Sequence, residues 1–259
     1  MNVHDRRVWI TGACSGIGEA LSYELSRRGA RLVLSSNRPE ALRKTRQRCP
    51  RPDDHVVQPL DLTEPDTLQT AVTRVHDEVG PVDVLVNNAG IAQRGPASDT
   101  EMDVVRRVME VNFFGAVQLT KAVLPLMQER GQGHVAVVSS VAGKFGAPSL
   151  STYCASKHAI QGWFDSMRAE VHDDGIGVTL ACPGFVQTSI ASNMIGTRKT
   201  KTVEKILEKG ISPSHCAEAI ADAIEREKAE FYVGGWEIIN LYLKRFVPSL
   251  LRRLLRAQS

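Results

Sequence analysis

The stretch Thr11-Gly12-Ala13-Cys14-Ser15-Gly16-Ile17-Gly18 lies between a short apolar run and a helical pattern. Strand, glycine-rich turn and helix is the order that a phosphate-binding turn requires. Gly12 permits the tight turn, Gly16 lets the backbone approach a pyrophosphate, and Gly18 lets the helix pack closely on the strand. The glycine spacing is GxxxGxG instead of the usual GxGxxG, and tight turns need glycine anyway. This stretch alone is therefore a weak indication of function.

The same alternation of apolar runs and helical patterns continues along the chain, which is typical of parallel βαβ units. We therefore predict an α/β fold with a Rossmann-like, doubly wound, seven-stranded parallel sheet in a single domain, residues 1–259. Ligands of such sheets bind at the carboxyl ends of the strands. The predicted strands are Arg7–Thr11, Arg31–Ser35, His55–Leu60, Val82–Asn87, Gly133–Ser139, Ile176–Cys182 and Glu230–Val233.

Composition is that of an ordinary globular protein: 259 residues are 42% hydrophobic and 24% charged, with a net charge of +3. This charge is too small to argue for nucleic-acid binding, and we expect no nucleic-acid partner. Five widely spaced cysteines without a CxxC pair predict no metal site and suggest reduced thiols in a cytoplasm. Met1 to Arg7 is polar, so we expect neither a signal peptide nor an N-terminal anchor. No apolar segment reaches the roughly 20 residues that a membrane span needs.

Tyr153 and Lys157 are the candidate acid-base pair. The apolar residues from Thr152 to Val171 recur at three- and four-residue steps, so this segment is predicted to be a helix. Because the two residues are four apart, their side chains share one face. A nearby ammonium favours the phenolate, so Lys157 is expected to lower the pKa of Tyr153 toward neutrality. A tyrosine four residues before a lysine is also a common helical pair without function.

Three more polar residues lie where the site is expected. Ser140 ends a predicted strand and could donate a hydrogen bond to a substrate oxygen. Asn88 also leaves a strand, where it could bridge strand ends and bind a ribose or simply form a turn. Asn112 lies among apolar neighbours and needs a partner, because buried amides are seldom unpaired. An asparagine can also hold the water that passes a proton onward from Lys157.

Taken together, these motifs resemble a classical member of the short-chain dehydrogenase/reductase family, over roughly residues 7 to 190. The resemblance implies that Tyr153 is the acid-base and that Ser140 positions the substrate oxygen. It implies that Lys157 binds the nicotinamide ribose and lowers the tyrosine pKa, and that Asn112 completes a proton relay. The motifs that carry the resemblance are residues 11–18, Asn87-Asn88-Ala89-Gly90, Asn112, Ser140, Tyr153 with Lys157, and Pro183-Gly184.

The resemblance also implies which residues hold a nicotinamide dinucleotide. Val186 and Thr188 would contact the carboxamide, while Asp61 and Leu62 would flank the adenine. For Asp61, helix capping or loop chemistry is about as good an explanation. The full set of expected cofactor contacts is Gly12, Ser15, Gly16, Ile17, Gly18, Ser36, Asn37, Arg38, Asp61, Leu62, Asn88, Ala89, Gly90, Tyr153, Lys157, Pro183, Gly184, Val186 and Thr188.

The residues after the second strand favour NADP(H) over NAD(H). NAD binders place an acid about 20 residues beyond the glycine turn, but here the segment reads Ser35-Ser36-Asn37-Arg38. Without an acid, nothing repels a 2′-phosphate, and Arg38 with Arg43 offers charge-assisted bonds to it. Several NADP-type family members carry arginine where this chain has Asn37, so the clamp is weaker or shifted.

The substrate is expected to be a small, hydrophobic alcohol or carbonyl compound. Family members place a substrate lid at about residues 188–210, and its start is largely apolar here, with Phe145 and Phe185 near in motif order. Ordinary core packing explains these residues equally well. The leading hypothesis is an NADP-dependent oxidoreductase that interconverts a hydroxyl and a carbonyl group. The alternative is a catalytically silent dinucleotide-sensing or scaffold protein with the same fold.

A C-terminal extension at about residues 236–259 follows the last predicted strand. It is rich in leucine and basic residues, and Pro248 is expected to break it into two short helices. It resembles the C-terminal part of the 11-beta-hydroxysteroid dehydrogenase branch, which implies a dimer whose tails cover the substrate entrance and touch lipid. We expect a homodimer or homotetramer in the cytoplasm, with peripheral membrane contact through the tail as the second choice.

Overall fold

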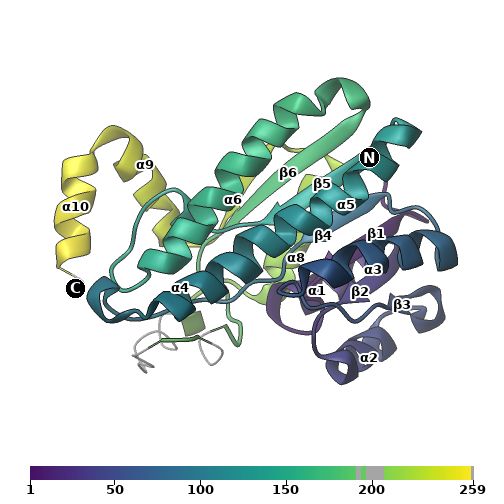
Figure 1. Ribbon diagram of the computed structural model, residues 1–259. Coiled ribbons are helices and arrows are strands. Elements are labelled where there is room, and N and C mark those ends of the chain that lie inside the picture. Colours follow the sequence, from purple (N-terminus) through teal and green to yellow (C-terminus); the bar gives the residue numbers. More distant parts are fainter. Residues whose placement is uncertain (191–193, 197–206, 258–259) are drawn as a thin grey trace.

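A parallel sheet of seven strands forms the centre of the computed structural model, which describes residues 1–190, 194–196 and 207–257 (Figure 1). The strand order is β3-β2-β1-β4-β5-β6-β7, and every adjacent pair is parallel. This confirms the predicted fold class. The strands are β1 (Arg7–Thr11), β2 (Arg31–Ser35), β3 (Val56–Val57), β4 (Val84–Asn87), β5 (Gly133–Val138), β6 (Ile176–Pro183) and β7 (Glu230–Val233).

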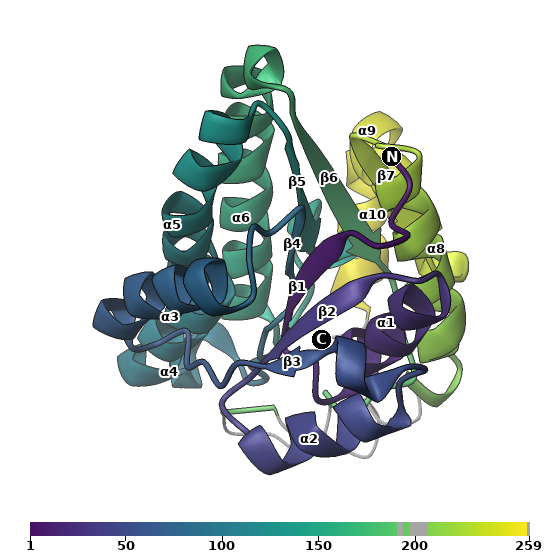
Figure 2. The ribbon, with the colours of Figure 1, turned by 90° about the vertical axis from the view of Figure 1, so that its right-hand side faces the viewer.

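Helices cover both faces of the sheet, and Figure 2 shows α1 and α8 on one side with α3, α5 and α6 on the other. Each of these five helices turns apolar side chains to the sheet, because their burial supplies most of the stability of a helix. The helices are α1 (Gly16–Arg27), α2 (Pro39–Arg48), α3 (Pro65–Glu78), α4 (Met102–Met109), α5 (Gly115–Arg130), α6 (Ser151–Glu170), α8 (Pro213–Glu225), α9 (Ile239–Phe246) and α10 (Pro248–Arg256).

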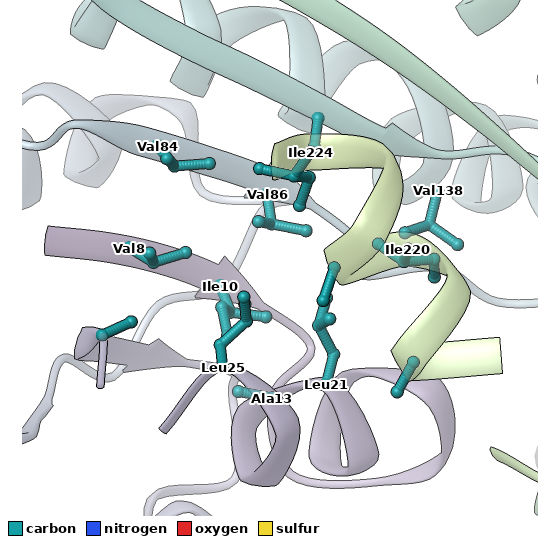
Figure 3. Close-up of a cluster of buried hydrophobic side chains, with 14 of the residues drawn as sticks. Val8, Ile10, Ala13, Leu21, Leu25, Val84, Val86, Val138, Ile220 and Ile224 are labelled. Atoms are coloured by element: carbon teal, nitrogen blue, oxygen red, sulfur yellow. The ribbon is translucent and has the colours of Figure 1, made fainter. Parts of the chain in front are cut away.

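The core on the α1–α8 side consists of aliphatic side chains from the central strands and these two helices (Figure 3). Val8 and Ile10 of β1 meet Leu21 and Leu25 of α1, while Ile220 reaches the same layer from α8. All five side chains are fully buried. Parallel strands covered on both faces read as continuous apolar runs, which is why β1 and its neighbours were recognisable in the sequence.

Two features depart from simple alternation. The region from Glu101 to Arg130 is interrupted by a π-helical segment, η3 (Glu110–Phe114), which separates α4 from α5. Single π turns inside helices frequently occur at functional sites. As predicted, Pro248 divides the C-terminal extension, so that α9 and α10 form a separate pair at one side of the molecule (Figure 1). Within the described residues, no helix combines the length and apolar character needed to cross a bilayer.

Candidate active site

The turn after β1 and the turn after β4 meet at the point where the strand order changes direction. Gly12 and Gly16 have φ angles of +65° and +56°, which favour glycine. A Cβ on Gly12 would lie 2.8 Å from the Ala89 Cα, and one on Gly18 would lie 2.3 Å from the Gly12 carbonyl oxygen. Glycine is therefore required for the two turns and α1 to pack together. Ser15, Gly16 and Ile17 at the start of α1 line the cavity described below, where the amides of a helix N-terminus suit a phosphate group.

A cavity of about 380 Å³ opens beside this turn. It is lined by most of the predicted cofactor contacts: Gly12, Ser15, Gly16, Ile17, Ser36, Asn37, Arg38, Asp61, Leu62, Asn88, Ala89, Gly90, Tyr153, Lys157 and Thr188. The lining omits six predicted site residues, namely Gly18, Asn112, Ser140, Pro183, Gly184 and Val186. Of these six, Ser140 still reaches the lining through its hydrogen bond with Tyr153.

Asn88 ties the ends of β1 and β4 together. Its side-chain amide donates to the Thr11 carbonyl oxygen at 2.9 Å and to the Gly12 carbonyl oxygen at 3.3 Å. The backbone amides of Asn88 and Ala89 donate to the Thr11 hydroxyl. The predicted bridge between strand ends is thus present, and Asn88 also lines the cavity.

Asn112 lies in the π-helical segment and is 1% exposed. Its Oδ1 accepts the Ile91 amide at 2.8 Å, and its Nδ2 donates to the Ile91 carbonyl oxygen and to the Ser156 hydroxyl. Both amide hydrogens are therefore used. The side chain therefore holds the turn after β4 against α6 as a donor, and a relay water could donate only to the second lone pair of its Oδ1 or to its backbone carbonyl.

Lys157 is a buried cation at the floor of the cavity. It is 4% exposed, and its Nζ donates to the Val138 carbonyl oxygen at 3.0 Å. Burial lowers the pKa of Lys157 to about 8, while the nearby Cys182 thiol acts in the opposite direction. The Nζ lies 5.8 Å from the centroid of the Tyr153 ring, so the two predicted partners do share one face of α6.

The pKa of Tyr153 moves opposite to the predicted direction. Burial raises the pKa of Tyr153 to about 12, a hydrogen bond with Ser140 lowers it, and Cys154 raises it. The prediction that Lys157 would lower this pKa is therefore wrong for the protein alone. The reason is that removing the phenol from water penalises the phenolate, and this effect outweighs the hydrogen bond with Ser140.

Ser140 is held at the end of β5 by backbone and side-chain bonds. Its hydroxyl accepts the Ala142 amide at 3.1 Å and donates to the Pro183 carbonyl oxygen at 3.4 Å. Gln161 donates to the Ser140 carbonyl oxygen and to the Ser139 hydroxyl, and it is buried. The sequence interpretation missed Gln161. The available signal was its spacing, because it lies four residues after Lys157 on the same helix.

The end of β2 forms the far side of the cavity. Arg38 donates to the Ser15 hydroxyl at 3.0 Å and approaches the Cys14 Sγ at 3.1 Å, so its guanidinium lies over the glycine turn. Arg43 instead pairs with Glu40 and is absent from the lining. The predicted contribution of Arg43 to the site is therefore not supported by its position.

Asp61 is the acidic residue of this region, and its carboxylate is held by its neighbours. It accepts the amide and hydroxyl of Thr63 and a longer bond from Asn37. Burial raises its pKa, but the Thr63 and Asn37 hydrogen bonds and the charge of Arg107 outweigh this and hold the pKa below its usual value. Arg107 lines the cavity and was missed in the sequence, although it precedes Val111, another lining residue, by one helical turn.

The predicted substrate contacts are distributed differently from expectation. Phe145 is buried against Leu251 of α10, and the Phe185 ring lies 6.2 Å from the Trp236 ring, so neither lines the cavity. Of the predicted lid, Thr188 to Ile190 line the cavity, while residues 191–193 and 197–206 lie outside the described residues. The larger apolar side chains that line the cavity are instead Ile17, Leu60, Leu62, Ile91, Val111, Val138 and Ile190.

Comparisons with known proteins agree with this architecture. The profile described as short chain dehydrogenase matches residues 6–199. Dehydrogenase/reductase SDR family member 7 of Homo sapiens is 38% identical over 254 residues, covering 95% of this chain and 75% of the relative. Dehydrogenase/reductase SDR family protein 7-like of Drosophila melanogaster is 40% identical over 252 residues, covering 94% and 77%. These relatives do not carry the name of the 11-beta-hydroxysteroid dehydrogenase branch.

Solved structures share the whole fold. A short-chain dehydrogenase from Streptomyces avermitilis superposes with a TM-score of 0.85 at 28% identity, covering 100% of this chain and 97% of its own. A short chain dehydrogenase/reductase from Burkholderia phymatum, solved in complex with NAD, superposes with a TM-score of 0.86 and covers 96% of each chain. At 23% identity, the second likeness shows the fold alone.

Proposed function

The chain belongs to the short-chain dehydrogenase family and is an NAD(P)-dependent dehydrogenase or reductase, and we propose that it interconverts a hydroxyl and a carbonyl group with NADP(H) on a small, hydrophobic molecule. The observation that carries this proposal is the placement of Tyr153 and Lys157 in one cavity with the glycine turn. The bound nicotinamide would supply or accept the hydride at the carbon.

Tyr153 would handle the proton at the oxygen. A pKa of about 12 keeps its phenol protonated at neutral pH, which suits proton donation to a carbonyl oxygen as that carbon is reduced. In the oxidation direction the phenol must first lose its proton, which requires added positive charge near the ring. Ser140, which hydrogen-bonds to Tyr153, would hold the same substrate oxygen. Lys157 would donate to the cofactor ribose beside its bond to Val138.

Cofactor choice rests on the rim formed by Ser15, Ser36 and Arg38. The Arg38 guanidinium is available at the glycine turn, and a 2′-phosphate beside it would gain charge-assisted hydrogen bonds. The Asp61 carboxylate is occupied by Thr63 and Asn37 and lies near Arg107, so its charge is partly offset. These contacts support NADP(H) over NAD(H).

The substrate class is inferred from the aliphatic side chains in the lining of the cavity that holds Tyr153. Ile91, Val111 and Ile190 are among them, and such surfaces bind apolar ligands by removing them from water. The alternative function is a dinucleotide sensor without turnover, which needs the glycine turn and Lys157 but has no use for the Tyr153 phenol as a proton donor. Turnover with a panel of ketones and aldehydes separates the two functions.

The C-terminal extension offers a second surface. Trp236, Ile239, Tyr242, Phe246, Val247, Leu250 and Leu254 are exposed, and the extension carries Lys244, Arg245, Arg252, Arg253 and Arg256. No acidic residue occurs in the sequence from Ile238 to Ser259. Two such surfaces in contact would repel each other, whereas an anionic lipid surface complements both the charge and the apolar side chains. We propose that lipid covers this surface, in place of the homodimer favoured by the sequence alone.

We expect Tyr153→Phe to lower kcat for carbonyl reduction by roughly 10²- to 10⁴-fold, because the proton donor is removed while the ring remains. NADPH binding, measured by fluorescence titration, should be retained. Lys157→Ala should lose both turnover and binding. Tyr242→Phe, which removes the hydroxyl of an exposed tyrosine of α9, is the matched control and should behave as wild type. Near wild-type turnover of Tyr153→Phe would refute the acid-base assignment.

We expect wild type to bind NADPH more tightly than NADH. Ser36→Asp should reverse this order by about tenfold or more, since a charge-assisted phosphate contact is lost and repulsion is added. Arg43→Ala should leave the order unchanged, because Arg43 is paired with Glu40 away from the cavity. Equal affinities of wild type for the two cofactors would contradict the proposed NADP preference.

We expect wild type to sediment with vesicles that contain phosphatidylserine and to stay in solution with phosphatidylcholine vesicles. Phe246→Ser and the double change Arg252→Gln with Arg253→Gln should each weaken sedimentation. Met102→Ser, which removes an exposed apolar side chain of α4, is the control and should have no effect. The contrary result has two parts: wild type does not bind vesicles, and light scattering shows a dimer that Phe246→Ser dissociates. It would favour a second copy of the chain, in place of lipid, as the partner of this surface.

A further inference from the structure

Glu237 is a buried carboxylate in the first turn of the C-terminal extension. It lies in the short helix η6 (Trp236–Ile238) and is 3% exposed. Its Oε1 accepts the Phe185 amide at 2.7 Å and the Gly235 amide at 3.0 Å. Among the described residues, no Lys, Arg or His forms an ion pair with it. The backbone amides are therefore the groups that compensate for burial of this charge.

The carboxylate explains why the residue before Phe185 is glycine. A Cβ on Gly184 would lie 1.9 Å from the Glu237 Oε1, so any side chain there would displace the carboxylate. The Gly184 amide also donates to the Val233 carbonyl oxygen at 2.8 Å. The turn after β6 is thus fixed to β7 by a backbone bond and to the extension by Glu237.

This turn contacts the active site on both sides of Phe185. On one side, the Pro183 carbonyl oxygen accepts the Ser140 hydroxyl. On the other side, Thr188 lines the cavity, and its Cγ2 would lie 3.2 Å from a Cβ on Gly16. Phe185 lies between these two contacts in the chain. The bond from its amide to Glu237 therefore fixes the backbone position of the segment that makes both contacts.

A carboxylate is a stronger choice for this bond than a neutral acceptor. Hydrogen bonds to an ionised acceptor are roughly twice as strong as neutral ones, whereas a buried charge is costly unless it is well paired. A neutral amide could accept the same two N–H groups without that cost. What fixes the turn is therefore an oxygen acceptor at this position that reaches both N–H groups.

We propose that Glu237 is a positioning residue for the reaction: by accepting the Phe185 amide, it holds the turn from Pro183 to Thr188 in place for the nicotinamide half of the cofactor. This inference rests on the proposed function. It makes the C-terminal extension part of the active-site structure, because α10 also packs through Leu251 against Phe145, in the connection that follows Ser140.

The test compares two ligands, of which one contains the nicotinamide half of the cofactor and the other lacks it. Full-length Glu237→Leu, which keeps the side-chain size but has no acceptor, is titrated calorimetrically with NADPH and with 2′,5′-ADP, which carries the adenosine half alone. We expect NADPH affinity to fall by about tenfold or more and 2′,5′-ADP affinity to stay within about twofold. The kcat for carbonyl reduction should fall as well, since the turn also contacts Ser140.

Conservative variants separate positioning from a general effect on the fold. Glu237→Gln keeps an oxygen acceptor and should restore most of the NADPH affinity, whereas the shorter Glu237→Asp should not. This pair decides the question even where Glu237→Leu does not fold. Glu225→Leu is the matched control, because it removes a carboxylate of α8 that binds Arg28 at the end of α1. It should leave both affinities unchanged.

Each outcome bears on one proposal. Equal losses of NADPH and 2′,5′-ADP affinity in Glu237→Leu would show a role in the fold only, and unchanged affinities would show no role; either result overturns the positioning proposal. Wild-type affinity in both Glu237→Asp and Glu237→Gln would also overturn it. If wild type binds neither NADPH nor NADH, the proposed function fails instead, before the variants are compared.

Discussion

Burial of the Lys157 ammonium is the constraint on which the site depends. The side chain lies at the end of β5 and is bound to the Val138 carbonyl oxygen, so its position is fixed by the sheet itself. The same removal from water that lowers the pKa of Lys157 raises that of Tyr153, so burial moves the titration of each group toward its neutral form. The pair is therefore prepared for proton donation, and additional positive charge is required before Tyr153 can act as a base.

Three polar side chains hold the surrounding turns, and each joins elements that are distant in sequence. Asn88 connects β4 to β1, Gln161 connects α6 to the Ser140 turn, and Glu237 connects the extension to the turn after β6. Parallel strands bring such turns to one edge of the sheet, but they do not fix their relative positions. The side-chain bonds supply that precision, which short distances at an active site require.

Much of the fold could be predicted because it depends on local patterns. Buried parallel strands read as apolar runs, and Pro248 ends a helix through its own ring. The direction of the Tyr153 pKa shift could not be predicted, since it depends on burial by residues from several elements. The π turn at Asn112 likewise depends on a bond to Ile91, 21 positions away, and the need for glycine at position 184 depends on Glu237. The spacing of residues within one helix or strand gives no information about contacts between elements that are distant in the sequence.

The most direct measurement is an absorbance titration of the Tyr153 phenol at 295 nm, taken as the difference between wild type and Tyr153→Phe. A phenolate gains its absorbance as pH rises through its pKa, and a raised pKa moves that gain to higher pH. Without cofactor, we expect no Tyr153 phenolate signal up to about pH 10.5, because its pKa is raised to about 12. With saturating NADP⁺, the positive charge of the nicotinamide ring beside the phenol should bring the signal below about pH 10. A Tyr153 signal near pH 10 without cofactor, unchanged by NADP⁺, would contradict the central claim that burial holds this phenol protonated until a cation joins it.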